Sequence, residues 1–151
     1  RLITAKSKGF PDGPKEAFNA LESHLTTLKR RKFYGLSYDS DEGTDYYAGL
    51  VPDDELEELR FADLGFPTKE IEGGSCVRVK LLDWSSKIDQ LGPAFGAMSD
   101  EYGFDATRPR MEFYRSMTEL HLLLPVPSSI QPRSHANNGG QLRGPSRMAR
   151  D

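Results

Sequence analysis

The sequence predicts an α+β domain in which a strand–helix–strand–strand unit occurs twice and shares one antiparallel sheet, with both helices on one face and a ligand cleft on the other. Three observations predict this fold. Apolar residues recur at helical spacing in two segments and alternate with polar ones elsewhere. Both helical segments contain an A-F-x-A-[LM] run, at 17–21 and 94–98, behind a Gly-Pro pair. Each run is followed by a hairpin pattern, so we expect duplicated units at about 1–52 and 66–126.

The first unit opens with a short apolar strand at 2–5 and continues into a helix. The helix is predicted from apolar residues three and four positions apart: Ala17, Phe18, Leu21, Leu25 and Leu28. Pro14 suits its first turn, and the basic run 29–32 suits its end, where cations face the negative helix terminus. Two strand-like runs, 33–38 and 46–51, then predict a hairpin around the turn-rich residues 39–43.

An acidic segment separates the two units. Residues 53–61 lack the spacing of a calcium-binding loop, so we expect a solvated loop with one helical turn. The second unit starts with alternating apolar residues that predict a strand over 71–82. A short helix over 93–102 follows, and strands at 110–115 and 120–124 complete the unit around a turn at 116–118.

Length and charge limit the classes of function. The chain has 151 residues, which fits one ordinary domain, and a net charge of −3. Residues 127–151 hold four arginines and one acid, so the rest of the chain carries 16 bases against 22 acids, a charge of −6. An acidic body disfavours direct binding of nucleic acid and favours cationic partners. The tail has few large apolar residues and is predicted to be a disordered basic extension.

The sequence also lacks several signals of compartment and chemistry. Cys76 is the single cysteine, so no internal disulfide is expected. No apolar run is long enough to span a membrane, and residues 1–6 lack the apolar region of a signal peptide, so we expect a cytoplasmic protein without membrane contact. No zinc spacing, phosphate-binding loop, nucleophile elbow or dinucleotide fingerprint occurs, so we expect no metal and no cofactor.

Glu112 is the strongest candidate for a functional residue. It lies inside a predicted strand between Met111 and Phe113, where a carboxylate is costly unless it is satisfied. Strand alternation places Glu112 and Tyr114 on one face, and Met111 and Phe113 on the other. If the apolar pair packs on the helices, Glu112 faces the cleft, where its charge and aromatic rings would attract a cation. The alternative is an ordinary ion pair with an arginine at either end of the strand.

Four further side chains are candidate ligand contacts: Tyr34, Tyr46, Trp84 and His121. Trp84 follows a predicted strand, where it either packs at the edge of the core or forms a stacking wall. Tyr46 and Tyr47 point to opposite faces, so only one of them can line the cleft. With a two-residue hairpin turn, His121 shares the face of Glu112 and can act as a general base. A turn one residue longer puts His121 on the other face.

Several motifs stand in order along the chain: Y-G-L at 34–36, Y-Y-A-G-L at 46–50 and G-G-S-C at 73–76. The most specific succession follows, with P-x-x-E-x-Y at 109–114, T-E-L at 118–120 and L-P-V at 124–126. In these motifs, residues 2–126 resemble the GyrI-like small-molecule-binding domains, which also form the effector-binding domains of multidrug-responsive bacterial regulators. The resemblance implies repeats related by a pseudo-twofold axis, with a cleft between them for small aromatic or cationic compounds. It also implies that Glu112 is the acidic pocket residue and that tyrosines and a tryptophan form the walls.

Members of this family differ in activity, so the resemblance leaves three functions open. The first is a stand-alone binder of small aromatic or cationic molecules, for sensing or sequestration, with Glu112 as the counter-charge. The second is a hydrolase of cyclopropane-bearing electrophilic toxins, in which Glu112 activates water or stabilises developing positive charge and Tyr114 donates or orients. The third is a protein-interaction module that shields a target such as gyrase, and only this function requires a protein partner.

Overall fold

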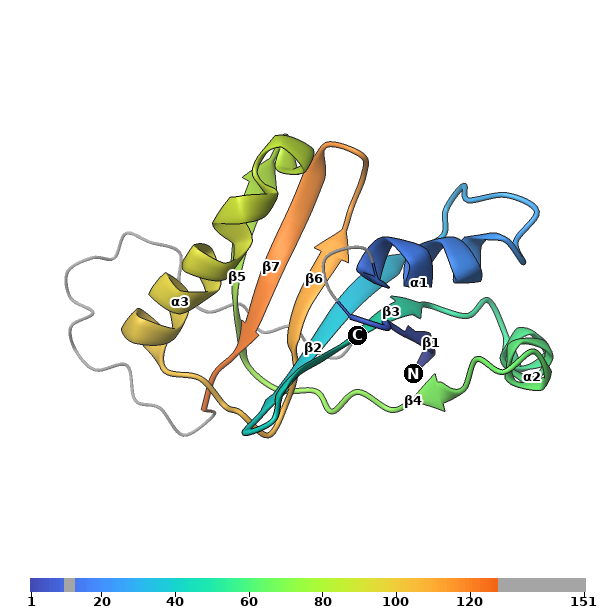
Figure 1. Cartoon of the computed structure of the whole chain (residues 1–151), viewed down its shortest axis with the longest axis horizontal. Helices are drawn as coiled ribbons and strands as arrows, with labels where there is room; N and C mark the ends of the chain where they lie inside the picture. Colours follow the sequence, from blue (N-terminus) through green and yellow to red (C-terminus); the bar gives the residue numbers. More distant parts are fainter. Residues whose placement is uncertain (10–12, 128–151) are drawn as a thin grey trace.

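The computed structural model describes residues 1–9 and 13–127 and contains a seven-stranded antiparallel sheet with three α-helices (Figure 1). The strands are β1 (Leu2–Lys6), β2 (Phe33–Ser40), β3 (Gly43–Leu50), β4 (Thr68–Lys69), β5 (Cys76–Leu82), β6 (Arg110–Tyr114) and β7 (Glu119–Pro125). Their order is β4-β1-β3-β2-β6-β7-β5. The helices are α1 (Gly13–Glu22), α2 (Glu55–Asp63) and α3 (Leu91–Tyr102). The predicted α+β class is confirmed, while the predicted basic tail lies outside the described residues beyond Pro127.

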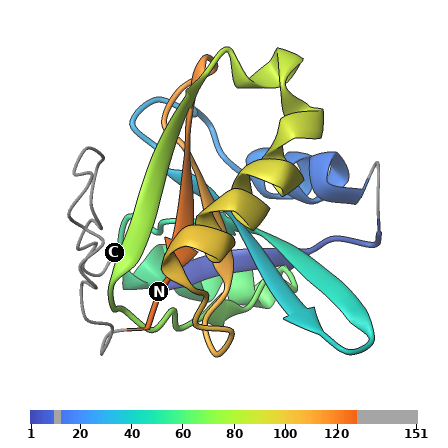
Figure 2. The ribbon, with the colours of Figure 1, turned by 90° about the vertical axis from the view of Figure 1, so that its left-hand side faces the viewer.

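Figure 2 shows α1 and α3 packed against the sheet, and each of the two helices covers an apolar cluster of its own. Beneath α1, Ala17 and Leu21 pack with residues of β1 and β3. Beneath α3, Phe95 and Met98 pack with residues of β5 and β7. We call these the α1 cluster (Ile3, Ala5, Ala17, Leu21, Ala48, Leu50 and Phe61) and the α3 cluster (Val77, Phe95, Met98, Leu120, Leu122, Leu124 and Val126).

The strand register shows that both clusters lie on the same face of the sheet. Ala48 of the α1 cluster pairs with Gly35, Gly35 pairs with Glu112, and Glu112 pairs with Leu122 of the α3 cluster. Directly paired residues of antiparallel strands point to the same face. The prediction that both helices lie on one face is therefore confirmed for α1 and α3.

The opposite face carries a third apolar cluster, which joins the two halves of the sheet. Leu2, Leu36, Met111 and Leu123 are its buried members. The segment between β4 and β5 runs from one edge of the sheet to the other, and its Ile71 packs against this cluster (Figure 1). Within the described residues, no helix has the length and apolar character that crossing a lipid bilayer requires.

Three predicted boundaries were wrong. The helix α1 ends at Glu22, so Leu25 and the basic run 29–32 belong to the connection that leads to β2. The strand predicted over 71–82 begins at Cys76, and the residues before it cross the sheet. The helix α3 begins at Leu91, behind two short 3-10 turns at Trp84–Ser86 and Ile88–Gln90.

The acidic segment forms the helix α2 rather than a loop. Asp54 caps its N-terminus, because the carboxylate accepts a hydrogen bond from the backbone N–H of Glu57 at 2.9 Å. Phe61 is fully buried in the α1 cluster, which fixes the helix to the rest of the domain. Leu56 and Leu59 are 75% and 63% exposed, so the leucines of this helix do not form the buried stripe by which a helix is usually predicted.

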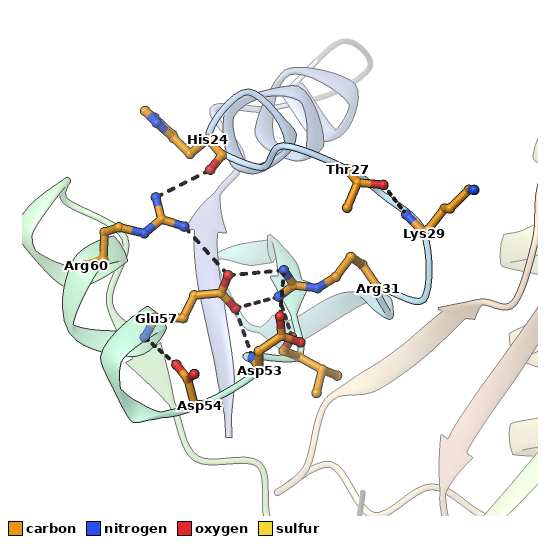
Figure 3. Close-up of polar contacts among 9 residues, drawn as sticks. His24, Thr27, Lys29, Arg31, Asp53, Asp54, Glu57 and Arg60 are labelled. Carbon is orange, nitrogen blue, oxygen red and sulfur yellow. Dashed lines mark hydrogen bonds and ion pairs between the residues drawn. The ribbon is translucent and has the colours of Figure 1, made fainter.

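Arg31, from the basic run, binds α2 instead of capping α1 (Figure 3). Its guanidinium donates to both carboxylate oxygens of Glu57, at 2.6 and 3.1 Å, and to the backbone carbonyl of Val51 at 3.1 Å. Both side chains are largely buried, at 8% and 11% exposure. A two-point contact of this kind holds the helix against the connection before β2.

This ion pair is expected to make the protein less stable as the pH falls into the acid range. The hydrogen bond from Arg31 lowers the pKa of Glu57 below its usual range. The stabilisation is therefore fully present above the unfolded-state pKa of about 4.3 and is lost as the pH falls through the folded-state pKa. We expect Glu57→Gln to lower the melting temperature at pH 7 and to have a smaller effect at pH 3.

Thermal unfolding at both pH values measures this difference. Glu55→Gln is the matched control, because Glu55 is an exposed carboxylate of the same helix without an ion pair among the described residues. An equal effect of Glu57→Gln at pH 7 and pH 3 would show that the pair does not titrate in this way.

Candidate functional site

Glu112 lies on the helix face of the sheet, between the α1 and α3 clusters. Its neighbours across the sheet are Gly35 on β2 and Leu122 on β7. The expectation that Met111 and Phe113 pack under the helices was wrong, because both face the third cluster on the opposite side. The sequence predicted that Glu112 and the helices lie on opposite faces of the sheet, and the structure places them on the same face.

The carboxylate of Glu112 is held by two tyrosines. The hydroxyl groups of Tyr46 and Tyr114 donate to the same oxygen, Oε1, at 2.8 and 2.7 Å. The two hydroxyl oxygens are 3.4 Å apart. The other carboxylate oxygen, Oε2, accepts no hydrogen bond from the described residues. The carboxylate is thus oriented through one oxygen while the other remains available.

Gly35 provides the space for this arrangement. A Cβ atom at this position would lie 2.0 Å from the hydroxyl oxygen of Tyr46 and 2.6 Å from Oε1 of Glu112. Distances this short do not occur between real atoms without a shift of one of them. The absent side chain on β2 therefore allows the tyrosine and the carboxylate to meet above the sheet.

Aromatic rings contact the ring of Tyr114 from both halves of the domain. Phe18 of α1 contacts the Tyr114 ring edge to face, with centroids 5.2 Å apart. Trp84, just after β5, makes a similar contact at 5.2 Å, and its indole N–H donates to the backbone carbonyl of Ser116 at 3.2 Å. Trp84 is also partly buried against the α3 cluster, so it is both a packing residue and part of the aromatic surround.

The electrostatics keep both tyrosines protonated. Burial, followed by the negative charge of Glu112, raises the pKa of Tyr46 and of Tyr114 far above the usual tyrosine value. Both phenols therefore donate to the carboxylate at neutral pH. Glu112 forms no ion pair with any residue of the described part of the chain, because Arg110 pairs with Asp39 at 2.8 Å instead.

Two predicted site residues lie on the opposite face. Tyr34 stacks on Phe113 with centroids 4.9 Å apart. His121 pairs with Phe113 in the strand register, and its Nε2 lies 2.7 Å from a carboxylate oxygen of Glu119. The hairpin turn has the longer form, because Arg115 and Ser116 both donate backbone hydrogen bonds to the carbonyl of Glu119. His121 therefore does not share the face of Glu112.

The structure brings together Glu112, Tyr114, Tyr46 and Trp84 from the predicted set, and it selects Tyr46 over Tyr47, which packs in the third cluster. Sequence reasoning missed Phe18 and Gly35 as site residues. Phe18 belongs to the repeated A-F-x-A-[LM] run, and Gly35 stands inside a strand pattern, which is itself a sign of close approach by another group.

Comparison of the chain with protein-family models, with curated proteins and with solved structures finds no match. The description of the site therefore rests on its geometry alone. The domain is an α+β fold with an antiparallel sheet, and a carboxylate held by two tyrosines lies on the sheet between two helices. Among residues 1–9 and 13–127, no three His, Cys, Asp or Glu side chains gather in a way that could hold a metal ion.

Proposed function

We propose that the protein binds a small aromatic cation at Glu112, in a cleft between its two halves, for sensing or sequestration. The observation that carries the proposal is the free oxygen Oε2 of a carboxylate that has no ion-pair partner among the described residues and lies beside aromatic rings. A partly buried carboxylate without a counter-ion is costly, and a cationic ligand would supply that counter-ion.

The surrounding groups suit a flat cation. The two tyrosine hydroxyls hold the carboxylate in one orientation, so a ligand does not have to order it. The rings of Phe18, Tyr114 and Trp84 offer π-systems near the charge, each contributing about 0.5–2 kcal/mol to a well-placed cation. Charge and stacking therefore act on the same ligand.

The sheet order supports the proposal that the chain is a duplicated GyrI-like domain. From its centre, the sheet reads β2-β3-β1 in one direction and β6-β7-β5 in the other. The chain passes through each half in the same sequence of strand, helix, strand and strand. A pseudo-twofold axis between β2 and β6 would relate the halves and place Glu112 beside that axis.

A hydrolase is the second candidate, because the Tyr114 hydroxyl is hydrogen-bonded to the same carboxylate whose other oxygen, Oε2, could act as a base. In that function, Oε2 would accept a proton from a water molecule whose oxygen bonds to a ring carbon of a strained electrophile, such as a cyclopropane-bearing toxin. A ring C–C bond would break, the released carbon would take up the proton held by Glu112, and Tyr114 would orient the reacting group. Glu112→Gln is then expected to abolish turnover and to keep most of the binding.

Binding of cationic and neutral aromatic dyes tests the proposal. Trp84 is the single tryptophan and lies at the site, so quenching of its fluorescence reports occupancy. We expect Glu112→Gln to weaken the binding of cationic dyes at least ten-fold, about 1.4 kcal/mol, and to leave neutral dyes within about two-fold. Glu101→Gln is the matched control, because Glu101 is an exposed carboxylate of α3.

Two results would contradict the proposal. If Glu112→Gln weakened the binding of cationic and neutral dyes equally, the charge of Glu112 would not be what attracts the ligand. Absence of saturable binding by any dye would exclude an open site of this kind and turn the search toward protein partners, as the gyrase-protecting alternative requires.

A further inference from the structure

A hollow of about 420 Å³ lies between α2 and the connection that joins α1 to β2. Residues 24–31 form one wall, and residues of 53–60 form the other (Figure 3). Its volume is within the range of small-molecule sites. The hollow contains none of the residues around Glu112, so it is a separate feature of the domain.

The charge of the hollow is opposite to that of the whole protein. Four side chains with a permanent positive charge line it, Lys29, Arg30, Arg31 and Arg60, against the acids Asp53 and Glu57. The lining thus has an excess of two positive charges in a chain whose net charge is −3. A concave surface with a local excess of cations concentrates anions from solution.

The acid at the base of the hollow is already neutralised. Both oxygens of Glu57 accept hydrogen bonds from Arg31, and Oε1 also accepts the backbone N–H of Asp53 at 2.9 Å. Figure 3 shows this contact between α2 and the connection that leads to β2. Because Arg31 and Glu57 satisfy each other, the remaining bases decide what the hollow can bind.

Those remaining bases have unused donors. Lys29 and Arg30 form no ion pair within the described residues. Arg60 makes two long polar contacts, 3.4 Å to the carbonyl of His24 and 3.6 Å to Glu57, its guanidinium lies over the Phe61 ring at 4.8 Å, and its side chain is half exposed. Lys29 and Arg30 thus have no ion-pair partner among the described residues, and Figure 3 shows the Lys29 side chain directed away from Arg31 and Glu57.

The backbone at Arg30 is a conformational outlier. Its φ of 62° lies in the left-handed region, in a turn closed by the hydrogen bond from the N–H of Arg31 to the carbonyl of Leu28. A side chain other than glycine costs about 1–2 kcal/mol in this conformation. Strained residues of this kind are concentrated at ligand sites, and here the strained residue carries one of the unused cations.

We propose that this hollow binds a phosphate-type dianion, either free or carried by a small molecule. The two excess positive charges match the charge of the ligand, and Lys29, Arg30 and Arg60 supply N–H donors to its oxygens. The flexible stem of Lys29 allows its ammonium group to follow ligands of different size. The hollow shares no lining residue with the proposed cation site at Glu112.

Calorimetric titration with inorganic phosphate and with glycerol phosphate tests the proposal, in buffer kept at constant ionic strength with chloride. The test variant is Lys29→Ala/Arg30→Gly, because glycine adopts the left-handed conformation of residue 30 without strain. The control is Lys15→Ala/Arg78→Ala, which removes two exposed positive charges outside the hollow. We expect saturable binding that the test variant weakens at least ten-fold and the control changes by less than about two-fold.

Two outcomes would overturn the proposal. Equal weakening in the control would show a general effect of protein charge rather than a site. Absence of saturation by either ligand up to about 10 mM would show that the hollow holds no phosphate-type anion. If both ligands saturate, the ratio of their affinities identifies the source: tighter glycerol phosphate indicates a phosphomonoester, and tighter inorganic phosphate indicates the free ion.

Discussion

Gly35→Ala is expected to destabilise the domain by about 1–3 kcal/mol and to disconnect Tyr46 from Glu112. The added methyl group would lie 2.0 Å from the Tyr46 hydroxyl and 2.6 Å from the Glu112 carboxylate. The ring of Tyr46 is only 6% exposed, so it cannot swing into solvent to make room. Urea unfolding measures the loss of stability, and dye titration measures the loss of the site.

Gly96→Ala is the matched control for this prediction. Gly96 lies inside α3, and a Cβ atom there would meet nothing within 4 Å. Alanine is the better helix former, so we expect a change between zero and a gain of about 1 kcal/mol. If Gly35→Ala were as stable as Gly96→Ala and still bound dyes, the close packing around Glu112 would not be needed for the fold or the site.

Arg108→Met is expected to cost about 2–4 kcal/mol of stability, the largest effect of a single side chain outside the apolar clusters. Arg108 is 7% exposed, and its guanidinium joins three segments of the chain. It donates to Asp105 at 3.0 Å, to the carbonyl of Ser75 before β5 at 3.0 Å, and to the carbonyl of Val126 after β7 at 2.9 Å. Methionine would remove all three contacts, although the Ser75 carbonyl keeps the N–H of Val126 and Asp105 keeps its hydrogen bonds from Thr107.

Two further variants make the test of Arg108 specific. Arg108→Lys is expected to restore little of the loss, because one ammonium group cannot reproduce the planar fork of donors. Arg78→Met removes the same charge from an exposed position of β5 and is expected to change stability by less than about 0.5 kcal/mol. Urea unfolding curves of Arg108→Met and Arg78→Met that coincide would contradict the role of Arg108.

Alternation along β6 correctly predicted which residues share a face, and Glu112 and Tyr114 do lie together. It did not predict which face the helices cover, because both faces of the sheet carry an apolar cluster. Met111 is as well buried in the third cluster as it would have been under a helix. The face on which Glu112 lies relative to α1 and α3 is set by the pairing of β6 with distant strands, and this pairing cannot be predicted from the residues of β6 alone.

Other errors have similarly local causes. The apolar periodicity continued past the end of α1 because Leu25 packs against the α1 cluster from the following connection. Helix α2 was missed because Leu56 and Leu59 point to solvent. His121 was placed on the wrong face because one additional turn residue reverses the facing of a whole strand, and the sequence around Met117 permits either turn.

The carboxylate of Glu112 also divides the apolar packing of the domain. The α1 cluster contains no residue from beyond position 61, and the α3 cluster contains none from before position 77. The ladder between β2 and β6, the third cluster and the contact of Phe18 with Tyr114 connect the two halves. The hydrogen bond from Tyr46 to Glu112 also crosses from the first half to the second. Each helix is therefore packed within one half of the chain, and the contacts around Glu112 are among those that hold the two halves together.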